Sequence, residues 1–142
     1  MTDATTIHKT IFLKASRETV WSFLTDKDKL GTWFHRAEAD LSEGREYTMN
    51  RIADDGGKVR QIWGRVIKAD PPATLTCTFL IDPFKGVETT VTWVLEEAAG
   101  GTRLSLTHAG IAEAAGPAAQ HLLIALDCGW DDHLGKLREA AA

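Results

Sequence analysis

The sequence predicts an α+β fold in which a curved antiparallel sheet of six strands is covered by one long C-terminal helix. Five alternating apolar segments follow one another through short turns, and strands joined in this way pair antiparallel. Two short helical segments separate them from an earlier strand. An antiparallel sheet has one apolar face that needs cover, and only the last 25 residues or so form a helix long enough to supply it.

The first strand is predicted over residues 6–15, where Ile7, Lys9, Ile11 and Leu13 share one face. Ser16 then stands where a helix N-cap is expected, and the pattern continues as helix to Asp26. Residues 27–34 read as a second short helix or turn. The N-terminal third is therefore expected to supply one strand and two short helices.

The remaining strands are predicted by period-two alternation and by turn residues between them. Asp55-Gly56 is a hairpin signal, and residues 110–117 read as a loop. The strands are expected at 47–52, 58–69, 74–81, 88–97 and 102–108. An alternating edge strand such as 88–97 could pair with a second copy in a homodimer.

The facing of the strand at 58–69 stays open, because two alternating sets of residues compete for the core. Val59, Gln61, Trp63, Arg65 and Ile67 form one set, and Ile62, Gly64 and Val66 form the other. Trp63 and Arg65 can therefore lie on the outer face.

The final helix is predicted from Pro117 to about Ala140, because leucines recur at helical spacing around Trp130. The segment 127–137, DCGWDDHLGKL, also carries a thiol, three carboxylates and an imidazole. At about 100° per residue these polar groups point in different directions, so neither a metal site nor a Cys–His nucleophile is expected. Gly129 is expected to allow another element to approach beside Trp130.

Composition limits the class of protein. The 142 residues suit one domain spanning 1–142, and the net charge of −4 without a basic run gives no nucleic-acid footprint.

No signal peptide or apolar run of about 18–20 residues is found, so a cytoplasmic protein without a membrane span is expected. Cys77 and Cys128 are expected to be reduced thiols. No cofactor is predicted.

Four segments in order resemble the family of activator of heat-shock protein 90 ATPase homologues. They are ASRETVWSFLTDKDKLGTWF (15–34), GRVIKADPPATLTCTF (64–79), TTVTWVLEEAAGGTRLSLTHAG (89–110) and GWDDHLGKL (129–137). The resemblance implies the START-like helix-grip (SRPBCC) fold, with a hydrophobic cavity between sheet and C-terminal helix. The co-chaperone that names this family contacts the chaperone largely through a separate N-terminal domain, so the family name is poor evidence that this chain activates or contacts the chaperone.

We therefore expect a small hydrophobic or amphipathic ligand to bind in a cavity between the sheet and the last helix. His108 shares a strand face with Leu104 and Leu106, so it is either a polar anchor for the ligand or a strand-end histidine satisfied by backbone. His35 either borders the cavity mouth or is an exposed loop residue. The predicted ligand-binding residues are Trp33, Phe34, Met49, Phe79, Trp93, Leu106, His108, Leu123, Leu126 and Trp130.

Two other functions remain open at this point. A cyclase- or aromatase-like enzyme would need two or more ionisable groups converging inside the cavity. A stress-response or chaperone-associated interaction module would need a sizeable exposed apolar patch. We expect a binding protein rather than an enzyme, with no catalytic or metal-ligating residue assigned.

Overall fold

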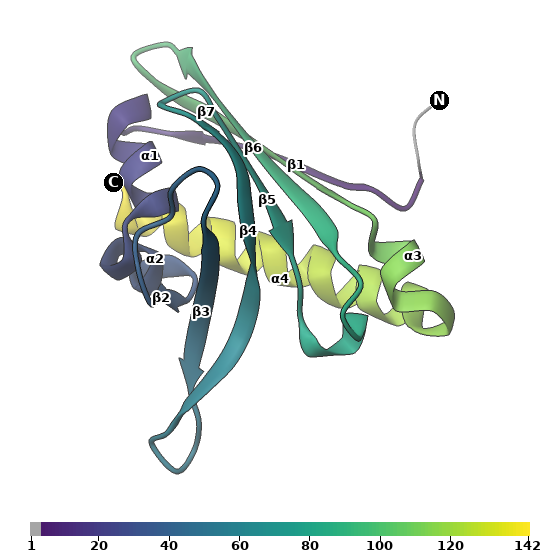
Figure 1. Cartoon of the computed structure of the whole chain (residues 1–142). Coiled ribbons are helices and arrows are strands. Elements are labelled where there is room, and N and C mark those ends of the chain that lie inside the picture. The colour runs from purple at the N-terminus through teal and green to yellow at the C-terminus, as the bar shows by residue number, and fades with distance from the viewer. Residues whose placement is uncertain (1–3) are drawn as a thin grey trace.

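The computed structural model describes residues 4–142 and contains one curled antiparallel sheet, with strand order β1-β7-β6-β5-β4-β3-β2. The sheet wraps around one side of a long helix (Figure 1). Its strands are β1 (Ile7–Leu13), β2 (Arg36–Ala37), β3 (Glu46–Ile52), β4 (Lys58–Asp70), β5 (Thr74–Phe79), β6 (Thr89–Ala98) and β7 (Gly101–Ala109).

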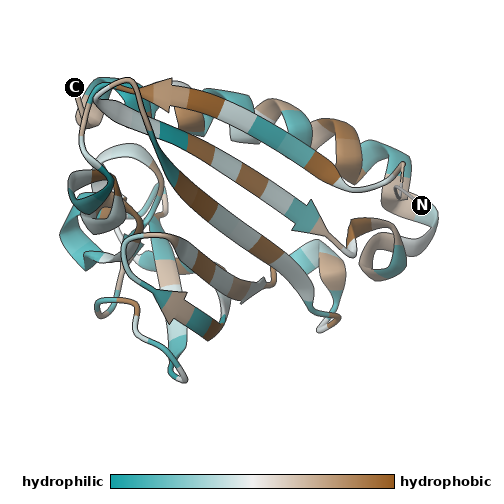
Figure 2. Ribbon diagram, turned by 90° about the horizontal axis from the view of Figure 1, so that it is seen from above, coloured by the Kyte–Doolittle hydropathy of each residue, from teal (hydrophilic) through white to brown (hydrophobic). Residues whose placement is uncertain are grey.

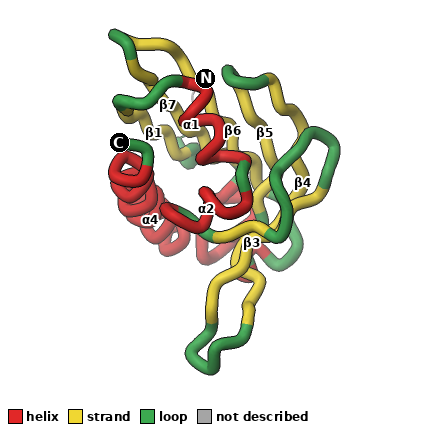
Figure 3. Tube along the Cα trace, turned by 90° about the vertical axis from the view of Figure 1, so that its left-hand side faces the viewer, coloured by secondary structure: helices red, strands yellow, loops and turns green. Residues whose placement is uncertain are grey.

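Four α-helices accompany the sheet. The longest, α4 (Ala119–Ala140), runs along the hollow side of the sheet, as the end-on view in Figure 3 makes clear. Near its C-terminal end lie α1 (Arg17–Thr25) and α2 (Lys27–Trp33), and at its N-terminal end lies α3 (Ile111–Ala115). Single 3-10 turns occur at 82–84 and 116–118. Within residues 4–142, no helix combines the length and apolar character needed to cross a membrane.

The predicted α+β helix-grip class is confirmed, with three local corrections. The sheet has seven strands rather than six, because two residues after α2 pair with β3 as β2. The expected loop at 110–117 contains α3, whose buried Ile111 and Ala115 are four residues apart on one face. The strand predicted at 88–97 is the interior strand β6, paired on both sides, so it offers no free edge for a homodimer.

The inner faces of the strands follow the predicted alternation, which Figure 2 shows as alternating hydrophobic and hydrophilic bands. On β7, Leu104, Leu106 and His108 are all buried, as expected. On β4 the open question is decided in favour of Ile62 and Val66, which are buried. Trp63 lies on the outer face, where the Arg60 guanidinium sits 3.7 Å from its ring centroid.

A β-bulge in β4 changes which side chains face the interior. Met49 pairs with Ile62, but the next pair joins Asn50 to Arg60, so Gln61 is an extra residue on β4. A bulge of this kind interrupts the two-residue period of a strand. As a result Gln61 and its neighbour Ile62 both border the same cleft beneath α4.

The buried side of α4 carries the predicted apolar residues, including Trp130 and Leu134. Its acidic flank is not merely solvated, because the ammonium of Lys9 on β1 lies 2.7 Å from Asp127 and 2.9 Å from Asp131. The expectation for Gly129 was wrong. A Cβ built there meets no atom within 4 Å, so no other element approaches this glycine closely.

Candidate functional site

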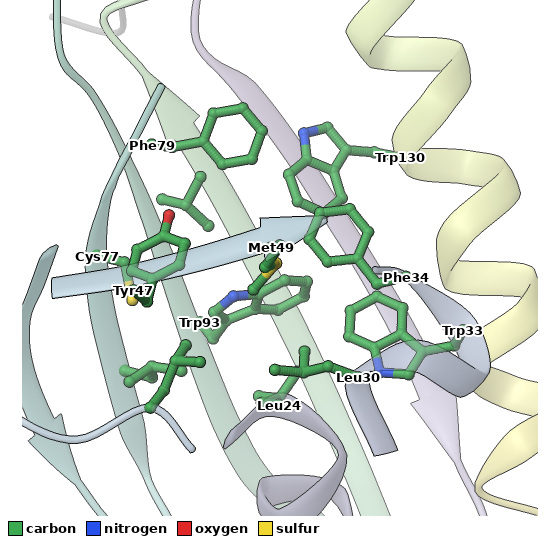
Figure 4. A pocket seen from close by; sticks show the side chains of 13 residues that line it. Leu24, Leu30, Trp33, Phe34, Tyr47, Met49, Cys77, Phe79, Trp93 and Trp130 are labelled. Atoms are coloured by element: carbon green, nitrogen blue, oxygen red, sulfur yellow. The ribbon is translucent and has the colours of Figure 1, made fainter. Parts of the chain in front are cut away.

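An aromatic cavity lies between the sheet and the helices α1, α2 and α4 (Figure 4). Its volume is about 30 Å³. The rings of Trp33 and Trp93 meet edge to face at 6.0 Å, and those of Trp93 and Trp130 at 5.6 Å. The lining residues are Leu24, Leu30, Trp33, Phe34, Leu41, Tyr47, Met49, Leu75, Cys77, Phe79, Val91, Trp93 and Trp130.

The size of this inner cavity limits what it holds in the present conformation. A single water needs roughly 10–15 Å³ of such space, whereas pockets for drug-sized ligands measure about 300–1,000 Å³. At about 30 Å³ the inner cavity has room for one or two waters. Bulky aromatic side chains fill most of the space that the sheet and α4 enclose.

A second hollow, the outer cleft, opens on the other side of the same aromatic wall and has a volume of about 110 Å³. Phe34, Phe79 and Trp130 line both spaces. Phe34 is stacked on Trp130 with the ring centroids 5.3 Å apart and the planes 27° apart, and the two rings lie together in Figure 4. The outer cleft is lined by Phe34, His35, Gln61, Ile62, Phe79, Ile81, Leu126, Gly129, Trp130 and His133.

The structure brings most of the sequence-predicted residues to these two spaces. Trp33, Phe34, Met49, Phe79, Trp93 and Trp130 line the inner cavity, and Leu126 lines the outer cleft. Three predicted residues line neither space. Leu106 is buried elsewhere in the core, Leu123 borders a surface hollow near Ala4–His8, and His108 lies behind Trp130.

His108 is fully buried and both of its ring nitrogens have partners. The Trp130 indole Nε1–H donates to Nδ1 at 3.1 Å, which places the imidazole proton on Nε2. Nε2–H then donates to the Thr89 hydroxyl at 2.8 Å, because that hydroxyl donates its own proton to the Phe79 carbonyl. His108 therefore ties α4 to β5 and β6, and its partners are side chains rather than the backbone.

Burial lowers the pKa of His108 from its usual 6.5 to about 3. In the charged form, Nδ1 would carry a proton that points at the Trp130 Nε1–H, and the buried imidazolium would have no water to solvate it. The neutral form accommodates both hydrogen bonds. His108 thus holds Trp130 in place with no nitrogen left over for a ligand in this conformation.

The histidine pKa values predict that the protein loses stability as the pH falls below about 6.5. The unfolded chain binds protons at histidines with a pKa near 6.5, whereas folded His108 stays neutral to about pH 3 and His35 to about pH 4. When the pH is lowered from 6 to 5, each of these two histidines should therefore lower the free energy of unfolding by about 1 kcal/mol. Denaturant titrations at both pH values measure this change. In His108→Gln the change should be smaller by the contribution of His108, about 1 kcal/mol. An unchanged pH dependence in His108→Gln would contradict the assignment.

A pair of histidines stands at the outer cleft: His35, for which a position at the cavity mouth was one of two expectations, and His133, to which no role was assigned. The rings of His35 and His133 are 5.4 Å apart, and both line the cleft. Burial is the main cause that lowers the pKa of His35 to about 4, followed by the charges of His133, Lys136 and Arg51. The sequence signal for His133 is its position three residues after Trp130 on the same helix. That His35 and His133 lie beside each other could be found only from the tertiary fold.

Within residues 4–142, no three histidine, cysteine, aspartate or glutamate side chains gather in an arrangement that could hold a metal ion. Cys77 is buried, and burial raises its thiol pKa to about 12, while Cys128 is exposed on α4. Both spaces are therefore walled mainly by aromatic side chains. The polar groups that line the outer cleft are the imidazoles of His35 and His133 and the amide of Gln61.

Comparison with solved structures shows the same fold in several bacterial proteins. CalU16 from Micromonospora echinospora is 24% identical, with a TM-score of 0.75, over 100% of this chain and 82% of its own. MLL2253 from Mesorhizobium loti is 22% identical, with a TM-score of 0.76, over 95% of each chain. A protein from Arthrobacter aurescens has a TM-score of 0.82 at 16% identity, over 99% of this chain and 89% of its own.

Comparison by sequence gives a family match and no individual one. No curated protein matches the chain. The family model described as "Activator of Hsp90 ATPase homolog 1-like protein" matches residues 14–142, which include every residue that lines the inner cavity and the outer cleft.

Proposed function

The chain belongs to the family of activator of Hsp90 ATPase homolog 1-like proteins, and from this premise we propose that it binds a small hydrophobic or amphipathic molecule in the outer cleft, between the sheet and α4. The observation that carries the proposal is the cleft itself. It is concave, walled mainly by aromatic and aliphatic side chains, and supplied with a few polar groups, which is the composition of small-molecule sites in general.

The volumes favour the outer cleft over the inner cavity as the point of entry. The cleft, at about 110 Å³, is close to the roughly 150 Å³ of an apolar cavity that accepts one benzene ring. Phe34 lies between the two spaces, so a ligand that displaces its ring would join them and reach Met49 and Trp93. The proposed wall consists of Trp33, Phe34, Met49, Gln61, Phe79, Trp93, Leu126, Gly129 and Trp130.

The proposal predicts that Gly129→Leu abolishes binding without unfolding the protein. Gly129 lines the cleft and has open space beside it, so a leucine there would occupy the volume of a ligand ring. Leucine also favours the helix over glycine by about 0.8 kcal/mol, so stability should rise slightly. Titration with toluene, followed through the amide NMR signals of cleft residues, should give a Kd near 1 mM in the wild type.

Gly135→Leu is the matched control, because Gly135 is exposed on the same helix and lies outside the cleft. It should bind toluene as the wild type does, whereas Gly129→Leu should show at least a tenfold weaker Kd, about 1.4 kcal/mol. Native mass spectrometry of the purified protein then identifies any molecule retained from the cell. Equal toluene binding by both variants would refute the outer cleft as the site.

A further inference from the structure

Resting on the ligand-binding function proposed above, we propose that His133 selects the class of ligand. Its Nε2 atom accepts a hydrogen bond from the hydroxyl group of a single-ring aromatic molecule, a phenol, held in the outer cleft. The main evidence is the hydrogen bond between Nδ1 of the same imidazole and the Trp33 carbonyl, because it fixes which ring nitrogen carries the proton.

The tautomer of His133 follows from its partner. Nδ1 lies 3.2 Å from the backbone carbonyl oxygen of Trp33, and a carbonyl oxygen can only accept. Nδ1 therefore carries the proton. A neutral imidazole has a single N–H, so Nε2 presents a bare lone pair and can act only as an acceptor.

Within the described residues the Nε2 lone pair of His133 is unpaired, and it reaches the surface of the protein. No partner for Nε2 exists among residues 4–142. In that part of the chain, no side-chain nitrogen or oxygen is both buried and without a hydrogen-bond partner. Nε2 is therefore not sealed in the interior, and the outer cleft is the space that His133 lines.

The walls beside Nε2 suit one aromatic ring. The Phe34 ring meets the imidazole of His133 edge to face at 4.7 Å and is itself stacked on Trp130. Aromatic rings gain from such offset-stacked and edge-to-face contacts beyond the area they bury. With about 110 Å³ available, the cleft has space for a single ring with a small substituent rather than for a fused ring system.

The neutral state of the His133 imidazole favours a hydroxyl over a carboxylate as the partner of Nε2. Burial is the largest influence and lowers its pKa; the Trp33 carbonyl bond raises it, Lys136 lowers it and Asp132 raises it. The pKa of the neighbouring His35, which also faces Arg51, is lowered to about 4. Both imidazoles are therefore neutral at pH 7. A carboxylate would bring its own lone pairs against that of Nε2, whereas a hydroxyl brings a proton.

Phenol and toluene provide the test, because they have the same number of heavy atoms and differ only in OH against CH₃. Each is titrated into the full chain and into His133→Phe, which keeps a ring of similar size and removes the acceptor. The ratio of phenol affinity to toluene affinity should fall about tenfold in His133→Phe, because a hydrogen-bond partner in the cleft is lost. The affinity for toluene should change less than threefold.

His35→Phe is the control, because His35 lines the same cleft and neighbours the same ring. It should keep the wild-type ratio. If both ligands bind the wild type and His133→Phe leaves the ratio unchanged, or if His35→Phe causes the loss, the role of His133 is overturned and ligand binding by the cleft stands. If neither ligand binds the wild type, the proposed function falls together with this inference.

Discussion

Replacing Trp130 by alanine is expected to lower the free energy of unfolding by about 5 kcal/mol. The indole is 3% exposed and contacts the rings of Phe34, Trp93 and Phe79 with centroids 5.3–5.9 Å away. Removing so large a buried side chain costs about 3–5 kcal/mol. The substitution also leaves Nδ1 of His108 without a donor inside the protein, which adds about 1–3 kcal/mol.

Trp130→Phe helps to separate the two contributions, because it keeps one aromatic ring in the core and removes the Nε1–H donor. We expect a loss of about 2 kcal/mol, measured like the alanine variant by denaturant unfolding at pH 7. Domains of this size are stable by about 5–15 kcal/mol, so Trp130→Ala should lose at least about a third of its free energy of unfolding. A loss below about 2 kcal/mol in Trp130→Ala would refute its role as the central contact of α4.

Gly64→Ala is expected to lower the free energy of unfolding by about 3 kcal/mol. This is the opposite of the usual effect, since alanine is ordinarily more favourable than glycine within a strand. A Cβ at position 64 would lie 2.3 Å from the carbonyl oxygen of Thr78 and 2.7 Å from its hydroxyl oxygen. The carbonyl accepts the Tyr47 hydroxyl at 2.6 Å, and the Thr78 hydroxyl accepts the Arg65 amide at 2.8 Å. The backbone has to move, and both hydrogen bonds, one buried and one partly buried, are disturbed.

Gly135→Ala is the control for Gly64→Ala. Gly135 lies in α4, where an added Cβ would meet no atom within 4 Å, so alanine should raise stability by up to about 1 kcal/mol through helix propensity. Unfolding titrations of the two variants should therefore shift in opposite directions from the wild type. A stabilised Gly64→Ala would mean that β4 and β5 can move apart at this position without loss.

Much of the fold could be predicted because its signals are local. The alternation of Leu104, Leu106 and His108 and the helical spacing around Trp130 each depend on residues close in sequence. The hairpin turn at Asp55-Gly56 was found in the same way, and Gly56 takes up the left-handed backbone that such a turn favours. Failures began where a segment is too short to show a period, as in α3 and β2.

The candidate site could be predicted only in part, because its geometry depends on contacts between distant residues. The aromatic wall followed from the inward positions of Phe79, Trp93 and Trp130. The bulge at Gln61 could not be predicted from the sequence. It interrupts the two-residue alternation from which the inward and outward faces of a strand are inferred. The tautomer of His133 could not be predicted either, because only the approach of the Trp33 carbonyl places the proton on Nδ1.

Periodicity and turn residues specify the order of the elements, the faces of most strands and the aromatic character of the interior, because these signals act over a few positions. The tertiary packing set how much space those aromatic rings leave, and divided it into an inner cavity and an outer cleft. It also decided that both ring nitrogens of His108 have partners, whereas Nε2 of His133 has none among the described residues. Volume and hydrogen-bond partners arise from the packing of α2, α4 and the sheet against one another, and no short segment contains that information.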